Sequence, residues 1–105
     1  MSKDVPVVLA VLADETRWNI LTQIGAEDLS ASALADRLPV SRQAIAKHLS
    51  VLADAGFVES VRVGREIRYR AIGTPLGRLA DELDAIGRQW DRRMEAIKRI
   101  AERPD

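Results

Sequence analysis

The residues best suited to chemistry in this chain are polar and cationic side chains gathered in the segment 41–49. A helix through this segment turns Ile45 and Leu49 to one side and the polar residues to the other, because positions three or four apart share a face. Amide and guanidinium groups near the start of such a helix match the hydrogen-bonding edges of base pairs in a major groove. Gln43 suits adenine, and Arg42 suits guanine or a phosphate. We therefore expect DNA contacts from six residues: Ser41, Arg42, Gln43, Ala44, Lys47 and His48.

A second group of cations lies in the segment 57–72, where apolar and polar residues alternate on either side of a turn at Gly64. Alternation with a period of two, interrupted by glycine, predicts a β-hairpin. Arg65 at its tip is placed to enter a minor groove, and Arg62 and Arg68 on its strands are placed to contact phosphates. The alternative for both groups of residues is an ordinary solvated surface.

The charge distribution agrees with duplex DNA as a partner, although the formal net charge of the whole chain is zero. The segment 37–70 carries seven basic and three acidic residues, a net charge of about +4, and the remainder carries about −4. A basic centre within an acidic scaffold is typical of a small DNA-binding domain.

Enzymatic and metal chemistry find little support in the composition. The chain has no cysteine and one histidine, which excludes a disulfide framework, a thiol nucleophile and a thiolate metal site. It also has no glycine-rich phosphate loop and no paired carboxylates in an apolar setting. We expect a protein that is not an enzyme, with no catalytic residue, no cofactor and no metal site.

Capping residues and hydrophobic periodicity predict the helices that hold these groups in place. The four helices before the hairpin are expected to begin near Pro6, at Asp14, at Ser30 or Ser32, and at Ser41, with stops at Gly25, Pro39 and Gly56 and a polar turn over 26–29. The expected buried stripes are Trp18, Leu21, Thr22 and Ile24 in the second helix and Ile45, Leu49 and Leu52, flanked by Ala46 and Ala53, in the fourth. The fold class is therefore mainly α with a small β-hairpin: a winged helix-turn-helix of about five helices plus a two-stranded wing.

The two terminal helices are expected to form a homodimer. The last helix, from about Pro75 to Glu102, carries an apolar seam longer than so small a domain needs for its own core. Gly87 beside the seam would suit the close approach of a partner helix, and the all-apolar helix over 5–13 needs cover on a second side. The expected interface is Val5, Val8, Leu9, Leu79, Leu83, Ile86, Trp90, Met94 and Ile97. The alternative is that the seam packs only within the monomer.

Several of these segments resemble the ArsR family of winged helix-turn-helix repressors. The resemblance rests on three linked motifs in the right order: LADETRWNIL at 12–21, VSRQAIAKHLSVL at 40–52, and AGFV at 55–58 followed by Gly64, Arg65, Tyr69 and Arg70. It implies a DNA-binding repressor that acts as a dimer. The metal-sensor role of many relatives does not carry over, because the third helix has no cysteine and the last helix has no histidine. The chain is most similar to the metal-independent branch.

These inferences together predict one winged helix-turn-helix domain over 1–105, with a DNA-binding core at about 14–72 and dimerisation helices at about 4–13 and 75–103. The predicted function is sequence-specific transcriptional repression by a homodimer on an inverted-repeat operator. A module for protein–protein association and a regulator with an unknown organic effector are the alternatives. With no targeting segment and no membrane span expected, the predicted location is the cytoplasm.

Overall fold

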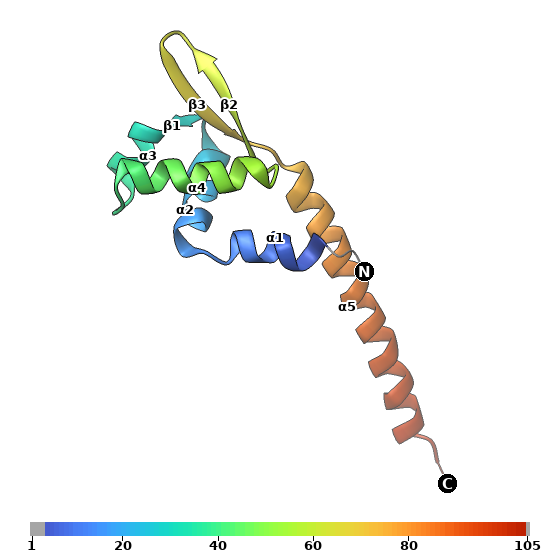
Figure 1. The fold of residues 1–105 in the computed structure, drawn as a ribbon. Coiled ribbons are helices and arrows are strands. Elements are labelled where there is room, and N and C mark those ends of the chain that lie inside the picture. Colours follow the sequence, from blue (N-terminus) through green and yellow to red (C-terminus); the bar gives the residue numbers. More distant parts are fainter. Residues whose placement is uncertain (1–3, 105) are drawn as a thin grey trace.

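The computed structural model describes residues 4–104 and contains five helices and three strands in these residues. Their order is α1 (Asp4–Leu12), α2 (Glu15–Ala26), β1 (Leu29–Ser30), α3 (Ala31–Arg37), α4 (Arg42–Asp54), β2 (Val58–Val63), β3 (Glu66–Ala71) and α5 (Thr74–Ala101). The hairpin β2–β3 projects from one side of the helices α1–α4, and α5 leaves on another side (Figure 1). This architecture confirms the predicted mainly helical, winged helix-turn-helix fold.

The core lies between the first four helices and the base of the hairpin. Its most completely buried side chains are Phe57, Ile20, Leu34, Ile45, Leu49 and Leu52. Each large apolar side chain removed from water in this way contributes about 1.5–3 kcal/mol relative to an exposed position. The core therefore fixes α4 through one face only and leaves its other face to solvent.

Side-chain caps start three of the helices at predicted residues. The carboxylate of Asp14 and the hydroxyls of Ser30 and Ser41 each accept a hydrogen bond from the backbone N–H three residues later, at 3.0–3.1 Å. Ser30, rather than Ser32, caps α3. Gly56 and Gly64 have positive φ angles of 83° and 64°, which side chains rarely adopt, and this explains glycine after α4 and at the hairpin turn.

The sheet has three antiparallel strands in the order β1–β3–β2, where two were expected. Residues 29 and 30, which are expected in a polar turn and at a helix cap, pair with Tyr69 and Arg68 of β3. A two-residue strand is too short to show an alternating pattern, so only its tertiary pairing defines it.

The prediction that Trp18 belongs to the core was wrong, since this side chain is 52% exposed. Helix α2 instead buries Ile20, Leu21 and Ile24, and Thr22 on the expected stripe is exposed. The observed stripe continues back to Arg17, which completes the i, i+3, i+4, i+7 spacing of one helical face. The true inner face of α2 therefore begins with an arginine. Gly25 does not end the helix, which continues to Ala26.

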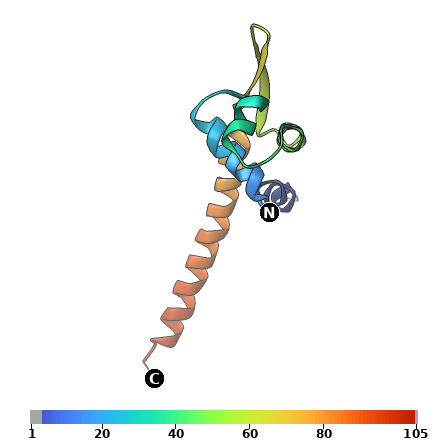
Figure 2. The ribbon, with the colours of Figure 1, turned by 90° about the vertical axis from the view of Figure 1, so that its left-hand side faces the viewer.

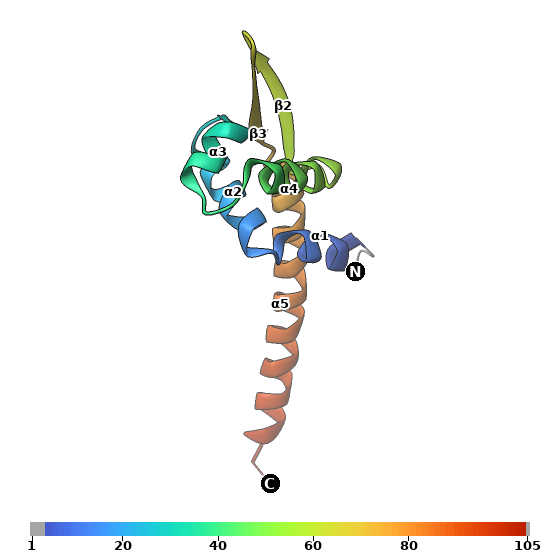
Figure 3. The same cartoon turned by 60° about the vertical axis from the view of Figure 1, so that its left-hand side comes forward.

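Helix α5 has 28 residues and makes the molecule strongly elongated. The chain measures 75 × 24 × 23 Å along its principal axes. The two further views show the C-terminal part of α5 extending beyond all the other elements that the structure describes (Figures 2 and 3). Its seam therefore lacks intramolecular cover over much of its length.

Candidate nucleic-acid interface

Helices α3 and α4 form a helix-turn-helix in which α4 exposes its polar side. Ile45, Leu49 and Leu52 hold the helix on the core, and all three are almost completely buried. The Ser41 hydroxyl accepts a 3.1 Å hydrogen bond from the backbone N–H of Ala44, so its oxygen satisfies the first turn of the helix. Ala46 and Ala53, which were expected beside the buried stripe, are exposed, so the buried face is narrower than predicted.

Three of the predicted DNA-contact residues lie free on the N-terminal half of α4. Arg42, Gln43 and Lys47 are exposed. Within residues 4–104, neither Arg42 nor Lys47 forms an ion pair with a carboxylate. Ala44 is half-buried next to the Ser41 cap. The outward side of this helical turn therefore offers two cations and one amide to an incoming ligand.

His48 does not point straight outward as expected. Its side chain is 22% exposed, and its Nδ1 lies 3.3 Å from Nη1 of Arg17 and 4.0 Å from Oδ1 of Asp14. The imidazole therefore faces the start of α2 from the edge of the buried stripe. Sequence reasoning missed Arg17, although its spacing from Ile20, Leu21 and Ile24 places it on the inner face of α2.

The wing arginines divide between two faces of the hairpin. Residues paired directly across antiparallel strands share a face, so Arg62, opposite Ile67, lies on the same face as Tyr69. Arg68, opposite Val61, lies on the other face. Arg65 follows Gly64 in the turn at the tip. The three predicted wing contacts therefore do not form a single row.

Ion pairs separate the wing cations further. Arg68 contacts the Glu66 carboxylate at 3.0 Å, and Arg70 contacts Asp28 at 3.0 Å. The hydrogen bond from Arg70 to Asp28 raises the pKa of this guanidinium and anchors the base of the hairpin to the segment before β1. In the described part of the chain, Arg62 and Arg65 form no ion pair with a carboxylate.

The residues expected at a dimer interface fall into three groups by exposure. Val5 and Leu79 are already buried within the monomer, and Val8 and Ile86 are half-buried. The exposed members of the set are Leu9, Leu83, Trp90, Met94 and Ile97. A Cβ added at Gly87 would meet nothing within 4 Å, so no close approach occurs there inside the monomer.

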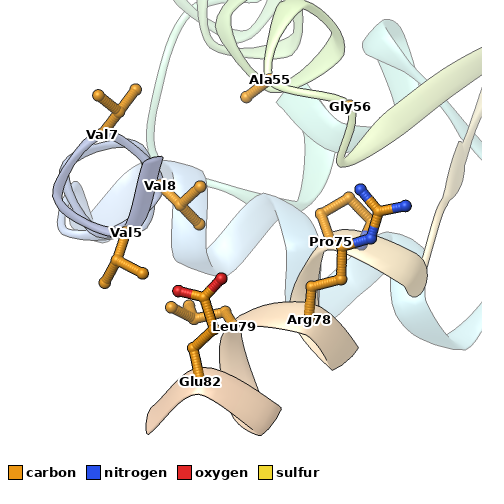
Figure 4. Close-up of a pocket in the computed structure, with 9 residues that line it drawn as sticks. All are labelled: Val5, Val7, Val8, Ala55, Gly56, Pro75, Arg78, Leu79 and Glu82. Carbon is orange, nitrogen blue, oxygen red and sulfur yellow. The ribbon is translucent and has the colours of Figure 1, made fainter. Parts of the chain in front are cut away.

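An open pocket of about 540 Å³ lies between α1, the end of α4 and the start of α5. Its lining is mostly apolar and consists of Val5, Val7, Val8, Ala55, Gly56, Pro75, Arg78, Leu79 and Glu82 (Figure 4). The Glu82 carboxylate points from α5 into this pocket. Its Oε2 atom is buried and has no hydrogen-bond partner among residues 4–104. The pocket therefore combines an apolar wall with one unsatisfied acceptor, which the sequence did not signal.

Residues 4–104 contain neither a cluster of metal ligands nor a helix that could span a membrane. These residues contain no group of three or more His, Cys, Asp or Glu side chains arranged to hold a metal ion. No helix in this range is long and apolar enough to span a membrane.

Comparison with known proteins connects this geometry to a family. A family model described as a helix-turn-helix domain matches residues 12–61. The HTH-type transcriptional regulator Rv2034 of Mycobacterium tuberculosis is 35% identical over 85% of this chain and 80% of that protein. The solved structure of an ArsR-like transcriptional regulator from Rhodococcus sp. RHA1 has a TM-score of 0.89 and 61% identity, covering 97% of this chain and 94% of that chain. The chain belongs to the ArsR family.

A third relative of this ArsR-family chain is the Streptomyces lividans protein named "Probable mercury resistance operon repressor". It is 34% identical over 67% of this chain and 54% of that protein. The family and its matching domain establish that the chain is a transcriptional regulator with a helix-turn-helix DNA-binding domain, and not an enzyme. The predicted fold class and family resemblance are thus confirmed.

Proposed function

We propose that this ArsR-family regulator represses transcription as a homodimer bound to an inverted-repeat operator. In this proposal, residues 14–72 form the DNA-binding core, and residues 4–13 and 75–103 form the dimerisation helices. The observation that supports it most strongly is the free polar edge of α4, where Arg42, Gln43 and Lys47 are exposed. Two wing cations that form no ion pair with a carboxylate of residues 4–104, Arg62 and Arg65, add to this positive surface.

Within this surface, the residues divide into base-reading and phosphate-binding roles. Gln43 lies in the first turn of α4, where an amide reaches the edge of adenine, and each good bidentate pair is worth about 1–3 kcal/mol of discrimination. Arg42 and Lys47 supply charge beside it, Ser41 is the N-cap of α4, and His48 lies about two turns further along the helix. Arg65 at the wing tip is proposed to enter a minor groove. Arg62, which pairs with no carboxylate in the described part of the chain, is proposed to bind phosphate, while Arg68 must first break its ion pair with Glu66.

The homodimer proposal rests on the uncovered part of α5. Leu76, Leu83, Trp90 and Ile97 recur every seven residues along this helix, and the last two are 68% and 47% exposed. A seven-residue apolar repeat is the pattern that a second helix covers.

The charges of α5 also suit a second copy of the same helix. The first half, residues 74–87, has three acidic residues and one arginine, a net charge of about −2, and the second half, residues 88–101, has five basic and two acidic residues, a net charge of about +3. Antiparallel pairing sets the acidic half of one copy against the basic half of the other. Gly87, which has open space around its Cα, lies at the middle of α5 and leaves room for the crossing.

We propose the repressor role because a dimer bound at a promoter would exclude other proteins from that DNA, and the role agrees with the name of the Streptomyces lividans relative. We do not propose mercury binding for this chain, because it has no cysteine to bind the metal. We therefore place the chain in the metal-independent branch of the family. Since its ligand is chromosomal DNA, the cytoplasm is the proposed location.

A second candidate function, regulation by an organic effector, is favoured by the pocket between α1 and α5. Its volume of about 540 Å³ is in the range of small-molecule sites. Its chemistry suits a ligand with an apolar body and one hydrogen-bond donor or ammonium group directed at Glu82. Because the walls of the pocket belong to both proposed dimerisation helices, ligand occupancy would act on the dimer.

The experiment that tests the DNA proposal is selection of bound fragments from the genomic DNA of the source organism. Wild-type protein and Gln43→Ala are then titrated against a selected duplex and its scrambled version. We expect Gln43→Ala to lose affinity for the selected duplex only, by the 1–3 kcal/mol given above for a bidentate pair, about 5- to 150-fold. Equal losses on both duplexes would count against base reading by this residue.

Salt separates this proposal from a module for protein association. Binding that neutralises phosphates weakens linearly in log affinity as log salt rises. An apolar contact with another protein has no such steep dependence. Absence of salt-sensitive duplex binding would favour the association module.

A further inference from the structure

Arg17 connects three separate segments although it belongs to none of the proposed DNA or dimer contacts. Its Nε donates a 2.7 Å hydrogen bond to the carbonyl of Val11, and its Nη2 donates a 3.4 Å bond to the carbonyl of Ala10. Both carbonyls lie at the end of α1, whose last turn contains no basic residue of its own. The terminal carbonyls of a helix need an external donor and carry partial negative charge. Arg17 therefore caps α1 from α2.

The remaining nitrogen of the same guanidinium, Nη1, reaches helix α4. Nη1 of Arg17 lies 3.3 Å from Nδ1 of His48 on α4 and 3.9 Å from Oδ2 of Asp14. A guanidinium can only donate, so this contact is a hydrogen bond in the tautomer whose Nδ1 is unprotonated. The imidazole proton is then on Nε2, which becomes a donor. Only 18% of the Arg17 side chain is exposed, so the group is held between the helices rather than lying on the surface.

We propose that Arg17 is a positioning residue that locks α4 to the end of α1 through His48. The inference rests on the proposed function, because α1 belongs to the proposed dimer and α4 to the proposed DNA contact. A link between them fixes the distance between the two recognition helices of a dimer. It also gives a ligand or partner that moves α1 a direct mechanical connection to α4. Asp14 supports the same junction by capping α2 beside the two side chains.

The first test uses two variants of His48, each of which keeps a polar group near only one of the two ring nitrogens. His48→Asn keeps an acceptor close to the position of Nδ1, and His48→Gln keeps a polar group close to the position of Nε2. Gln is a better helix former than Asn, so a larger loss of affinity for His48→Gln cannot come from a weaker helix. Operator affinity is measured for both by fluorescence anisotropy.

If Arg17 acts through Nδ1, His48→Asn stays within about twofold of wild type, and His48→Gln loses about tenfold relative to wild type, which corresponds to about 1.4 kcal/mol. If His48 acts only by contacting DNA through Nε2, the order of the two variants reverses. A reversed order, or equal affinities, overturns the inference while the proposed function stands. A wild-type protein without specific duplex binding overturns both.

The second test uses Arg17→Met, which keeps the aliphatic stem and removes every donor. Its affinity is measured for the full inverted repeat and for a single half-site. We expect about a tenfold loss on the full repeat and less than about a twofold loss on the half-site, because only the full repeat requires two correctly spaced helices. Urea unfolding confirms that the variant is folded in the assay. Equal losses on both duplexes, or none on either, would refute the positioning role.

Discussion

Salt dependence offers a quantitative test of which cations bind phosphate. Four cations of the proposed interface form no ion pair with a carboxylate in residues 4–104: Arg42, Lys47, Arg62 and Arg65. If each neutralises one phosphate, a dimer releases counterions at eight positions. Each position contributes about −0.9 to the slope of log affinity against log salt, so the expected slope is about −7.

The perturbation that tests this reasoning is Arg62→Gln, with Arg68→Gln as the matched control on the same hairpin. Losing one cation from each protomer makes the slope less steep by about 1.8 for Arg62→Gln. Arg68 lies on the opposite face and is already paired with Glu66 at 3.0 Å, so its removal changes the slope by less than about half of that amount. Both are measured by fluorescence anisotropy with a labelled operator at about 50–200 mM salt. An equal or larger effect of Arg68→Gln would refute the assignment of faces.

Four further outcomes are expected. Trp90→Glu, which charges the most exposed position of the interface set without touching the core, should give monomers in sedimentation and a strong loss of operator affinity; a dimeric variant would place the interface elsewhere. Ser41→Ala should lower the free energy of unfolding by about 1 kcal/mol in urea titrations, because the first turn of α4 loses its cap; no change would mean that water replaces the hydroxyl. The hydrogen bond from the Arg17 backbone N–H lowers the pKa of Asp14, so the stabilisation by its carboxylate is present above an ordinary aspartate pKa of about 3.9 and is lost as pH falls through the depressed value. Wild type should therefore lose more stability than Asp14→Asn on acidification, and parallel profiles would contradict this. Zinc, cadmium and arsenite should leave operator affinity unchanged, and release of DNA at micromolar metal would overturn the assignment to the metal-independent branch.

The parts of the fold that the sequence predicted are those determined locally. Asp14 and Ser41 cap helices because a short polar side chain can reach the backbone N–H three residues later. Gly56 and Gly64 mark turns because their φ angles are positive. Such features depend on a few neighbouring residues, so a single sequence reveals them.

The parts that the sequence missed depend on contacts between distant segments. The strand at residues 29–30 exists only through its pairing with β3. The helical spacing of Trp18 from Leu21 and Thr22 predicts a core residue, yet the inner face of α2 lies nearer to Arg17 and Ile20. In the sequence, an arginine next to an apolar stripe indicates the edge of the buried face. In the structure, Arg17 belongs to this face because it donates a hydrogen bond to the Val11 carbonyl at the end of α1.

The interface residues show the same division. Exposure of Arg42, Gln43 and Lys47 follows from helical periodicity, whereas the placement of His48 against Arg17 does not. The strand register separates Arg62 from Arg68, and only the ion pair with Glu66 shows that Arg68 is engaged. The exposed seam of α5 was visible as a repeat, but the burial of Leu79 within the monomer was not.

Hydroxyl-radical footprinting of the purified protein on a selected genomic fragment tests the central claim most directly. A two-fold dimer with one α4 per protomer should protect two half-sites whose centres lie about 10–10.5 base pairs apart, or a multiple of that spacing. The pattern should be symmetric about a point between them. Absence of specific protection at low salt, or a single protected half-site with no symmetric partner, would contradict a homodimer that reads an inverted repeat.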